Sequence, residues 1–122
     1  MFKIREKIQF AKEDNRMQFI ANTKIARDMY YSSKSNNAKF LLRQRFEWMN
    51  RFIKENDKGI EVGSGAGFSK DFIKNKNFKL TDLGDEDHLD LKNIDAQNTG
   101  FQEESLDFVI ASNMIHHIPY LI

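Results

Sequence analysis

Apolar residues in the first half of the chain recur at the spacing of an amphipathic helix. Between residues 42 and 53 they fall at steps of four, three and four, which places them on one helical face. These positions are Leu42, Phe46, Met49 and Ile53, and Trp48 and Phe52 are expected to widen the stripe. A second, less regular helix is predicted over residues 2–30, and the polar stretch 32–37 resembles a linker.

The second half of the chain carries short apolar runs that predict strands. One run enters at residues 58–60, another covers 78–80, and a third covers 106–112 and is rich in β-forming residues. The third run is mostly apolar and is bounded by polar residues, so it predicts a buried strand. Together with the helices, these runs predict an α/β protein.

A glycine-rich segment follows the first of these runs. Residues 61–67 read Glu-Val-Gly-Ser-Gly-Ala-Gly, and a helix-compatible run follows at 68–73. Glycines at alternate positions let the backbone leave a strand, turn sharply and approach a ligand with no Cβ in the way. The segment therefore indicates a site for an adenosine cofactor.

The glycine spacing separates two kinds of adenosine cofactor. A dinucleotide fingerprint, Gly-x-Gly-x-x-Gly counted from Gly63, would need its third glycine where Phe68 stands, so an oxidoreductase that uses a dinucleotide is disfavoured. Glu61 lies two residues before the first glycine, where a carboxylate suits an ammonium group better than a pyrophosphate. S-adenosylmethionine carries both an ammonium and a sulfonium.

The chain here resembles the class I S-adenosylmethionine-dependent methyltransferases, most closely the small-molecule branch often called type 11. The resemblance covers residues 58–120, with four motifs in the family's order at 61–67, 78–82, 95–96 and 106–117. It implies the N-terminal half of a doubly wound Rossmann-like sheet, strands 1 to 4, preceded by two helices. Residues 1–54 would form a helical segment or lid, and 55–122 a partial cofactor-binding domain.

The resemblance also implies that half of the family's seven-stranded sheet lies outside this chain, which is expected to be a fragment of a longer protein. Strand 4 would then present an exposed apolar edge, so self-association through that edge is expected. A second hypothesis from another functional class follows, in which a degenerate Rossmann-like domain serves as a non-catalytic interaction module.

The family's motifs place the candidate cofactor contacts residue by residue. The first motif supplies Glu61, Gly63, Ser64, Gly65 and Gly67.

Asp82 ends the apolar run at 78–80, where an acid can accept hydrogen bonds from both ribose hydroxyls. The alternative is a solvated loop acid, because acids crowd residues 85–90, and Asp85 is the nearest competitor. In the family, the acid at Asp95 accepts from the adenine amino group and the N–H of Ala96 meets a ring nitrogen. The alternative for Asp95 is an ordinary turn acid.

The fourth motif carries the remaining candidates. Ser112 and Asn113 fall where the family's fourth strand opens onto the methionine moiety and the incoming substrate. His117 is the candidate general base for a hydroxyl or amine acceptor, because imidazole titrates near neutral pH. The alternative is a histidine that packs or caps at a helix start. Methyl transfer asks little of side chains, since the sulfonium already activates the methyl group.

Charge is distributed unevenly along the chain. Residues 1–54 hold 13 Lys plus Arg against 5 Asp plus Glu, whereas residues 55–122 hold 6 against 13. A basic helical lid would steer an anionic small-molecule acceptor into the cleft, and the alternative is that these lysines and arginines solvate outer helix faces. Nucleic acid is a less favoured partner, because basic and aromatic residues are not interleaved.

Composition sets the remaining bounds. The 122 residues suffice for one domain at most, with 40% hydrophobic residues and eleven Phe for a core. The sequence has no cysteine, so it offers neither disulfides nor a thiolate metal site. It shows no apolar stretch of membrane-span length and no signal-peptide pattern at its start, so a cytoplasmic location is expected.

Overall fold

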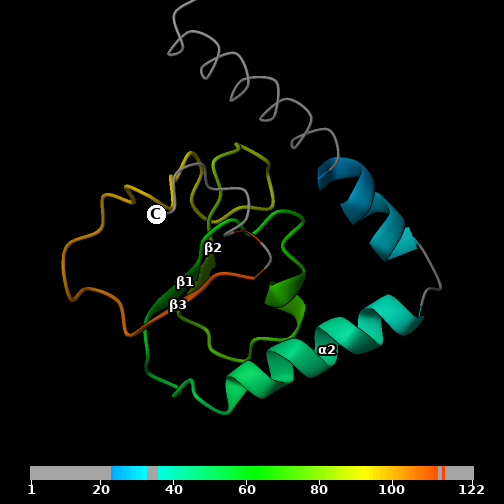
Figure 1. Cartoon of the computed structure of the whole chain (residues 1–122), viewed down its shortest axis with the longest axis horizontal. Coiled ribbons are helices and arrows are strands. Elements are labelled where there is room, and N and C mark those ends of the chain that lie inside the picture. Colours follow the sequence, from blue (N-terminus) through cyan, green and yellow to red (C-terminus); the bar gives the residue numbers. More distant parts are fainter. Residues whose placement is uncertain (1–22, 33–35, 113, 115–122) are drawn as a thin grey trace, which may run out of the picture.

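The computed structural model describes residues 23–32, 36–112 and 114. Residues 23–32 are helical, and the elements after them are α2 (Asn36–Asn50), β1 (Gly59–Glu61), the 3-10 helix η1 (Phe68–Asp71), β2 (Phe78–Leu80) and β3 (Phe108–Ile110) (Figure 1). The protein is thus α/β, with two helices and a small parallel sheet, as the sequence predicts. The predictions for Asn113 and His117, and most of the helix expected over 2–30, lie outside the described residues.

The three strands lie in the order β2-β1-β3, and both pairings are parallel. Ile60 at the centre of β1 is in register with Lys79 of β2 on one side and Val109 of β3 on the other. The chain therefore adds β2 to one side of β1 and then crosses to add β3 to the opposite side. All three carboxyl ends meet at one edge of the sheet (Figure 1).

The sheet has three strands in the described part of the chain, where the sequence analysis expected four. The missing strand is the third of the four that the family resemblance implies, which would precede the motif at 95–96. Its place is taken by a single parallel bridge between Thr81 and Leu91. The backbone N–H groups of Asp90 and Leu91 both donate to the Leu80 carbonyl, and Asn93 adopts a φ of 56°. The positive φ of Asn93 interrupts the extended conformation, so the segment stays beside the end of β2 through separate hydrogen bonds and forms no extended ladder.

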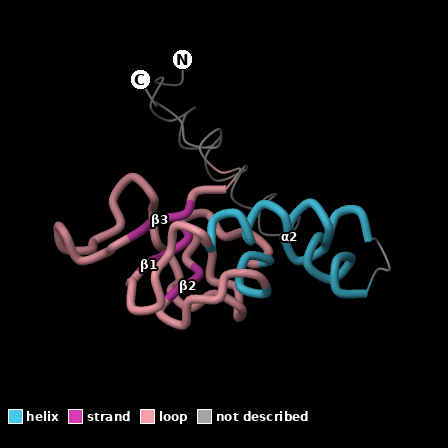
Figure 2. Tube along the Cα trace, turned by 90° about the horizontal axis from the view of Figure 1, so that it is seen from below, coloured by secondary structure: helices cyan, strands magenta, loops and turns pink. Residues whose placement is uncertain are grey.

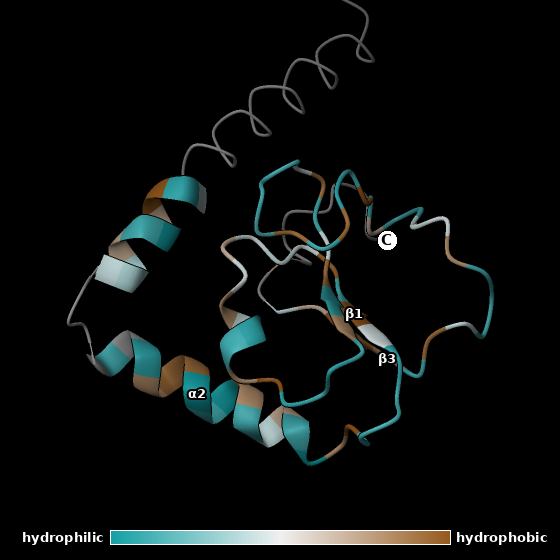
Figure 3. Ribbon diagram, turned by 180° about the vertical axis from the view of Figure 1, so that it is seen from behind, coloured by the Kyte–Doolittle hydropathy of each residue, from teal (hydrophilic) through white to brown (hydrophobic). Residues whose placement is uncertain are grey.

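The hydrophobic core lies between α2 and the sheet. Phe46 of α2 is buried, and it forms one cluster with Ile73, Phe78, Leu80, Leu89 and Ile110. Leu42, Met49 and Ile53 pack against this cluster, so the predicted apolar stripe is confirmed. In Figure 3, α2 correspondingly alternates between hydrophobic and hydrophilic bands, and in Figure 2 it lies beside the strands.

Two expectations about this layer are wrong. Trp48 and Phe52 do not widen the stripe, because their side chains are 56% and 69% exposed and pack edge to face on each other, 5.0 Å apart. The strand expected to be buried over 106–112 spans only β3, in which Val109 is 54% exposed. The reason is that β3 pairs only with β1 among the described residues, and so lies at an edge of their sheet.

None of the helices in the described part of the chain has the length and apolar character to span a bilayer.

Candidate functional site

The glycine-rich loop leaves β1 at the carboxyl edge of the sheet, with β2 on one side of β1 and β3 on the other. Gly63, Gly65 and Gly67 have φ values of 63°, 54° and 76°, a region that side chains with a Cβ rarely adopt. The Ser64 N–H donates to the Thr81 carbonyl at 3.0 Å, and the Gly67 N–H donates to the Ser64 carbonyl at 2.9 Å. The loop is therefore a tight turn, fastened to the residue that follows β2.

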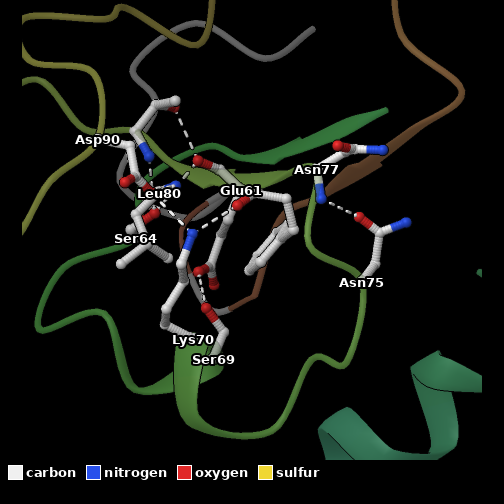
Figure 4. A network of polar contacts seen from close by, with 10 residues as sticks. Glu61, Ser64, Ser69, Lys70, Asn75, Asn77, Leu80 and Asp90 are labelled. Atoms are coloured by element: carbon white, nitrogen blue, oxygen red, sulfur yellow. Dashed lines mark hydrogen bonds and ion pairs between the residues drawn. The ribbon is translucent and has the colours of Figure 1, made fainter. Parts of the chain in front are cut away.

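Glu61 ends β1 and is one of the few buried charged residues, with 3% of its surface exposed. The Ser69 hydroxyl of η1 donates a hydrogen bond to the Glu61 carboxyl group, as Figure 4 shows. Burial raises the pKa of Glu61 to about 7; hydrogen bonds from Ser69 and Ser64 oppose this rise, and the charge of Asp82 adds to it. A buried carboxyl group with this pKa gains from a cationic partner.

Asp82 follows β2 and is buried, so the alternative of a solvated loop acid is wrong. One carboxylate oxygen accepts from the Gly65 N–H at 2.7 Å, and the other accepts from the Leu83 N–H at 2.6 Å. Asp85, its competitor in the sequence, is exposed. In this structure Asp82 holds the glycine-rich loop in place, and contact with a ribose stays a prediction.

A cavity of about 240 Å³ opens between α2, η1 and the carboxyl ends of β1 and β3. It brings together three of the predicted residues, Glu61, Ser64 and Ser112. The guanidinium of Arg45 also lines it and donates from Nη1 to Ser112 Oγ at 3.1 Å. The remaining lining residues are Leu42, Phe46, Phe68 and Ser69.

Asp95 and Ala96 do not line this cavity. Asp95 is exposed, and its carboxylate accepts from the Gln97 N–H at 2.9 Å, while its carbonyl accepts from the Asn98 N–H at 3.0 Å. These contacts are those of a turn acid, the alternative that the sequence left open. The Ile94 N–H donates to the Asp82 carbonyl at 2.8 Å, which fastens this turn beside the end of β2.

The helical segment 23–32 contacts the glycine-rich loop. Its role as a lid stays a prediction. Arg27 Nη1 donates to the Ala66 carbonyl, and Tyr30 stacks on Phe68 with ring centroids 4.0 Å apart. The Tyr31 hydroxyl donates to Asp71 at 2.8 Å, and burial together with this bond raises the pKa of Tyr31 to about 12.

These contacts could not be predicted from the sequence, because the partners are about 40 residues apart and the helical side carries no motif. Sequence analysis also missed His88, whose Nε2 lies 2.7 Å from the Gly65 carbonyl. Because a carbonyl only accepts hydrogen bonds, this geometry assigns the proton to Nε2. His88 stands in an acidic stretch of the sequence, and no motif there marked it as a candidate site residue.

Within residues 23–32, 36–112 and 114, no three His, Asp or Glu side chains are grouped so that they could hold a metal ion. Comparisons of the chain with protein-family models, with curated proteins and with solved structures gave no match.

Proposed function

We propose that this chain is the cofactor-binding portion of an S-adenosylmethionine-dependent methyltransferase that acts on a small molecule. The observation that carries the proposal is the buried Glu61 carboxyl group, which lines a cavity directly below a loop with three glycines at positive φ. The resemblance of the motifs to the family suggests the cofactor, and the buried carboxyl group beside the glycine-rich loop supports that assignment.

The position of the loop supports the proposal on general grounds. Ligands of open parallel sheets bind beyond the carboxyl ends of the strands, where successive connections leave in opposite directions. Here β2 and β3 lie on opposite sides of β1, and the glycine-rich loop starts at the end of β1. The proposal also includes the fold: β1, β2 and β3 would correspond to strands 1, 2 and 4 of the family's Rossmann-like sheet.

The chain's own residues suit the ammonium group and the shape of this cofactor. The Glu61 carboxylate would accept from the ammonium group, and the loop backbone at Gly63 and Gly65 would approach the ligand closely. When bound, the cofactor supplies a methyl group that its sulfonium already activates. The protein then has to hold the acceptor in line and exclude water, which the lid contacts of Arg27 and Tyr30 would assist.

The test is a calorimetric titration with S-adenosylhomocysteine, with NADH as a control ligand that shares the adenosine. We expect binding of S-adenosylhomocysteine alone. Glu61→Ala should weaken that binding by roughly 1.5 to 3 kcal/mol, the usual range for a hydrogen bond to a charged group. The exposed Glu55→Ala serves as the control. A folded sample that binds NADH, or neither ligand, would overturn the proposal.

One observation favours the second candidate, a non-catalytic interaction module. The outer side of β3 is an apolar groove lined by Met49, Phe52, Ile53, Phe108, Val109, Ile110 and Ala111. An edge strand with this surface is suited to pairing with a second chain. A stable dimer that does not bind S-adenosylhomocysteine would favour this candidate over the enzyme.

A further inference from the structure

Arg45 places an uncommitted positive charge at the cavity. Its guanidinium lines the cavity and makes one hydrogen bond, from Nη1 to the neutral Ser112 hydroxyl at 3.1 Å. The ion pairs in the described part of the chain join Lys70 to Asp90 and Lys92 to Asp87, so Arg45 has no carboxylate partner there. A guanidinium has five N–H donors, and most of those of Arg45 remain available to a ligand.

The rest of the lining shows which kind of ligand would use these donors. Leu42, Phe46 and Phe68 are apolar, and three serines offer hydroxyl groups. Among the described residues that line the cavity, the only other ionisable group is Glu61. Within the described part of the chain, Arg45 is therefore the one cationic side chain that lines the cavity. The planar fork of a guanidinium matches the two oxygens of a carboxylate, which it binds bidentately.

We propose that this cavity takes a ligand that bears a carboxylate, and that Arg45 is the residue that selects it. The proposal deepens the proposed function and rests on it, because it names the chemistry that the same site recognises. Glu61 and Arg45 together would favour a ligand that presents an ammonium group and a carboxylate to the two residues.

The carboxylate has two possible sources. It belongs either to the amino-acid part of the cofactor or to the methyl acceptor, and both would meet the same guanidinium. Ligands that differ only in this group distinguish the two sources.

The experiment compares S-adenosylhomocysteine with its decarboxylated analogue by calorimetry. The proteins are the wild type, Arg45→Gln, Arg45→Lys and, as the matched control, Arg43→Gln. Arg43 is an exposed arginine of the same helix that does not line the cavity. In parallel, succinate is titrated into the wild type and the side-chain Nε–H signals of Arg45 and Arg43 are followed by nuclear magnetic resonance.

If the cofactor supplies the carboxylate, the wild type binds S-adenosylhomocysteine about tenfold to a hundredfold more tightly than the analogue. Arg45→Gln abolishes this difference, Arg45→Lys reduces it, and Arg43→Gln keeps it. If the acceptor supplies it, the two ligands bind equally, and succinate shifts the Arg45 signal of the S-adenosylhomocysteine complex at concentrations that leave Arg43 unchanged.

Equal binding of the two ligands without a selective succinate shift would overturn the proposal. Failure of S-adenosylhomocysteine to bind at all would instead overturn the proposed function. Titration of succinate into the ligand-free protein then tests Arg45 as a carboxylate-binding residue. A shift of the Arg45 Nε–H signal without a shift of the Arg43 signal supports this role, and the absence of such a shift refutes it.

Discussion

The carboxylate of Asp82 accepts a hydrogen bond of 2.7 Å from the backbone N–H of Gly65, across the carboxyl edge of the sheet. The two residues are 17 positions apart, and the bond joins the end of β2 to the middle of the glycine-rich loop that follows β1. The second oxygen of Asp82 accepts from the Leu83 N–H at 2.6 Å. The shape of the loop thus depends on a side chain from the neighbouring strand.

Replacing Asp82 with Ala should therefore destabilise the protein. The change removes the buried carboxylate that accepts from the Gly65 N–H, and we expect a loss of about 2 to 3 kcal/mol in the free energy of unfolding. Urea denaturation followed by circular dichroism measures it. Asp85→Ala, at an exposed acid three residues away, should change stability by less than about 0.5 kcal/mol. Equal effects of the two changes would contradict the role assigned to Asp82.

The raised pKa of Glu61 predicts a fall in stability between weakly acidic and neutral pH. The native carboxyl group holds its proton up to a pH of about 7, whereas the unfolded chain releases it near 4.5. Between these values the native state binds more protons, so the free energy of unfolding falls as the pH rises, by about 3 kcal/mol in total, and levels off above pH 7.

Urea denaturation of the wild type and Glu61→Gln at pH 5 and pH 8 checks this expectation. The variant cannot release a proton, so it should lose less stability than the wild type between the two pH values. Glu55→Gln, at an exposed position, should keep the wild-type difference. If Glu61→Gln also kept it, the carboxyl group of Glu61 would not be the group that titrates.

Local patterns in the sequence predicted much of the fold. The runs at 58–60 and 78–80 became β1 and β2, and the helical spacing through Phe46 gave the face that packs on the sheet. These predictions depend on the period of side chains along one segment, which the sequence displays directly. The same rule failed for Trp48 and Phe52, because spacing shows which residues neighbour a stripe but not how far the partner surface extends.

Strand pairing and buried polar contacts were harder to predict from the sequence. The strand expected before Asp95 did not form, because Leu80 bonds to Asp90 and the chain then turns at Asn93. Within the site, Glu61 was recognised from its distance to the first glycine, whereas Arg27 and Arg45 had no local signal. Their partners lie 39 and 67 residues away, and only the folded chain brings them together.

Gly67 in the loop and Gly100 outside it allow the energetic cost of backbone strain to be measured separately from the cost of steric crowding. Gly67 and Gly100 share a φ of 76°, so replacing either with Ala incurs the same left-handed penalty of about 1 to 2 kcal/mol. A Cβ at Gly67 would also lie 2.8 Å from Leu80 Cδ1 and 2.9 Å from His88 Cδ2, whereas a Cβ at Gly100 would meet no atom within 4 Å.

We therefore expect Gly67→Ala to destabilise the protein by about 1 to 3 kcal/mol more than Gly100→Ala, the usual cost of overpacking. Thermal and urea unfolding of the two variants measures the difference. Equal losses would mean that the neighbours of Gly67 move aside at no cost. In that case the glycine at this position would be required by its backbone conformation alone.

The exposed edge of β3 predicts self-association at high protein concentration. Val109 is 54% exposed on this edge strand, and Phe52 beside it in the same apolar groove is 69% exposed. Pairing of two such edges would bury these side chains and add backbone hydrogen bonds between the two strands. Val109→Lys should abolish the association, because it would bring two like charges together within the interface. Leu83→Lys, at an apolar residue that is also exposed but lies outside the groove, should leave it intact. Sedimentation velocity over a hundredfold range of concentration distinguishes the outcomes, and a wild type that stays monomeric throughout would exclude β3 as an interface.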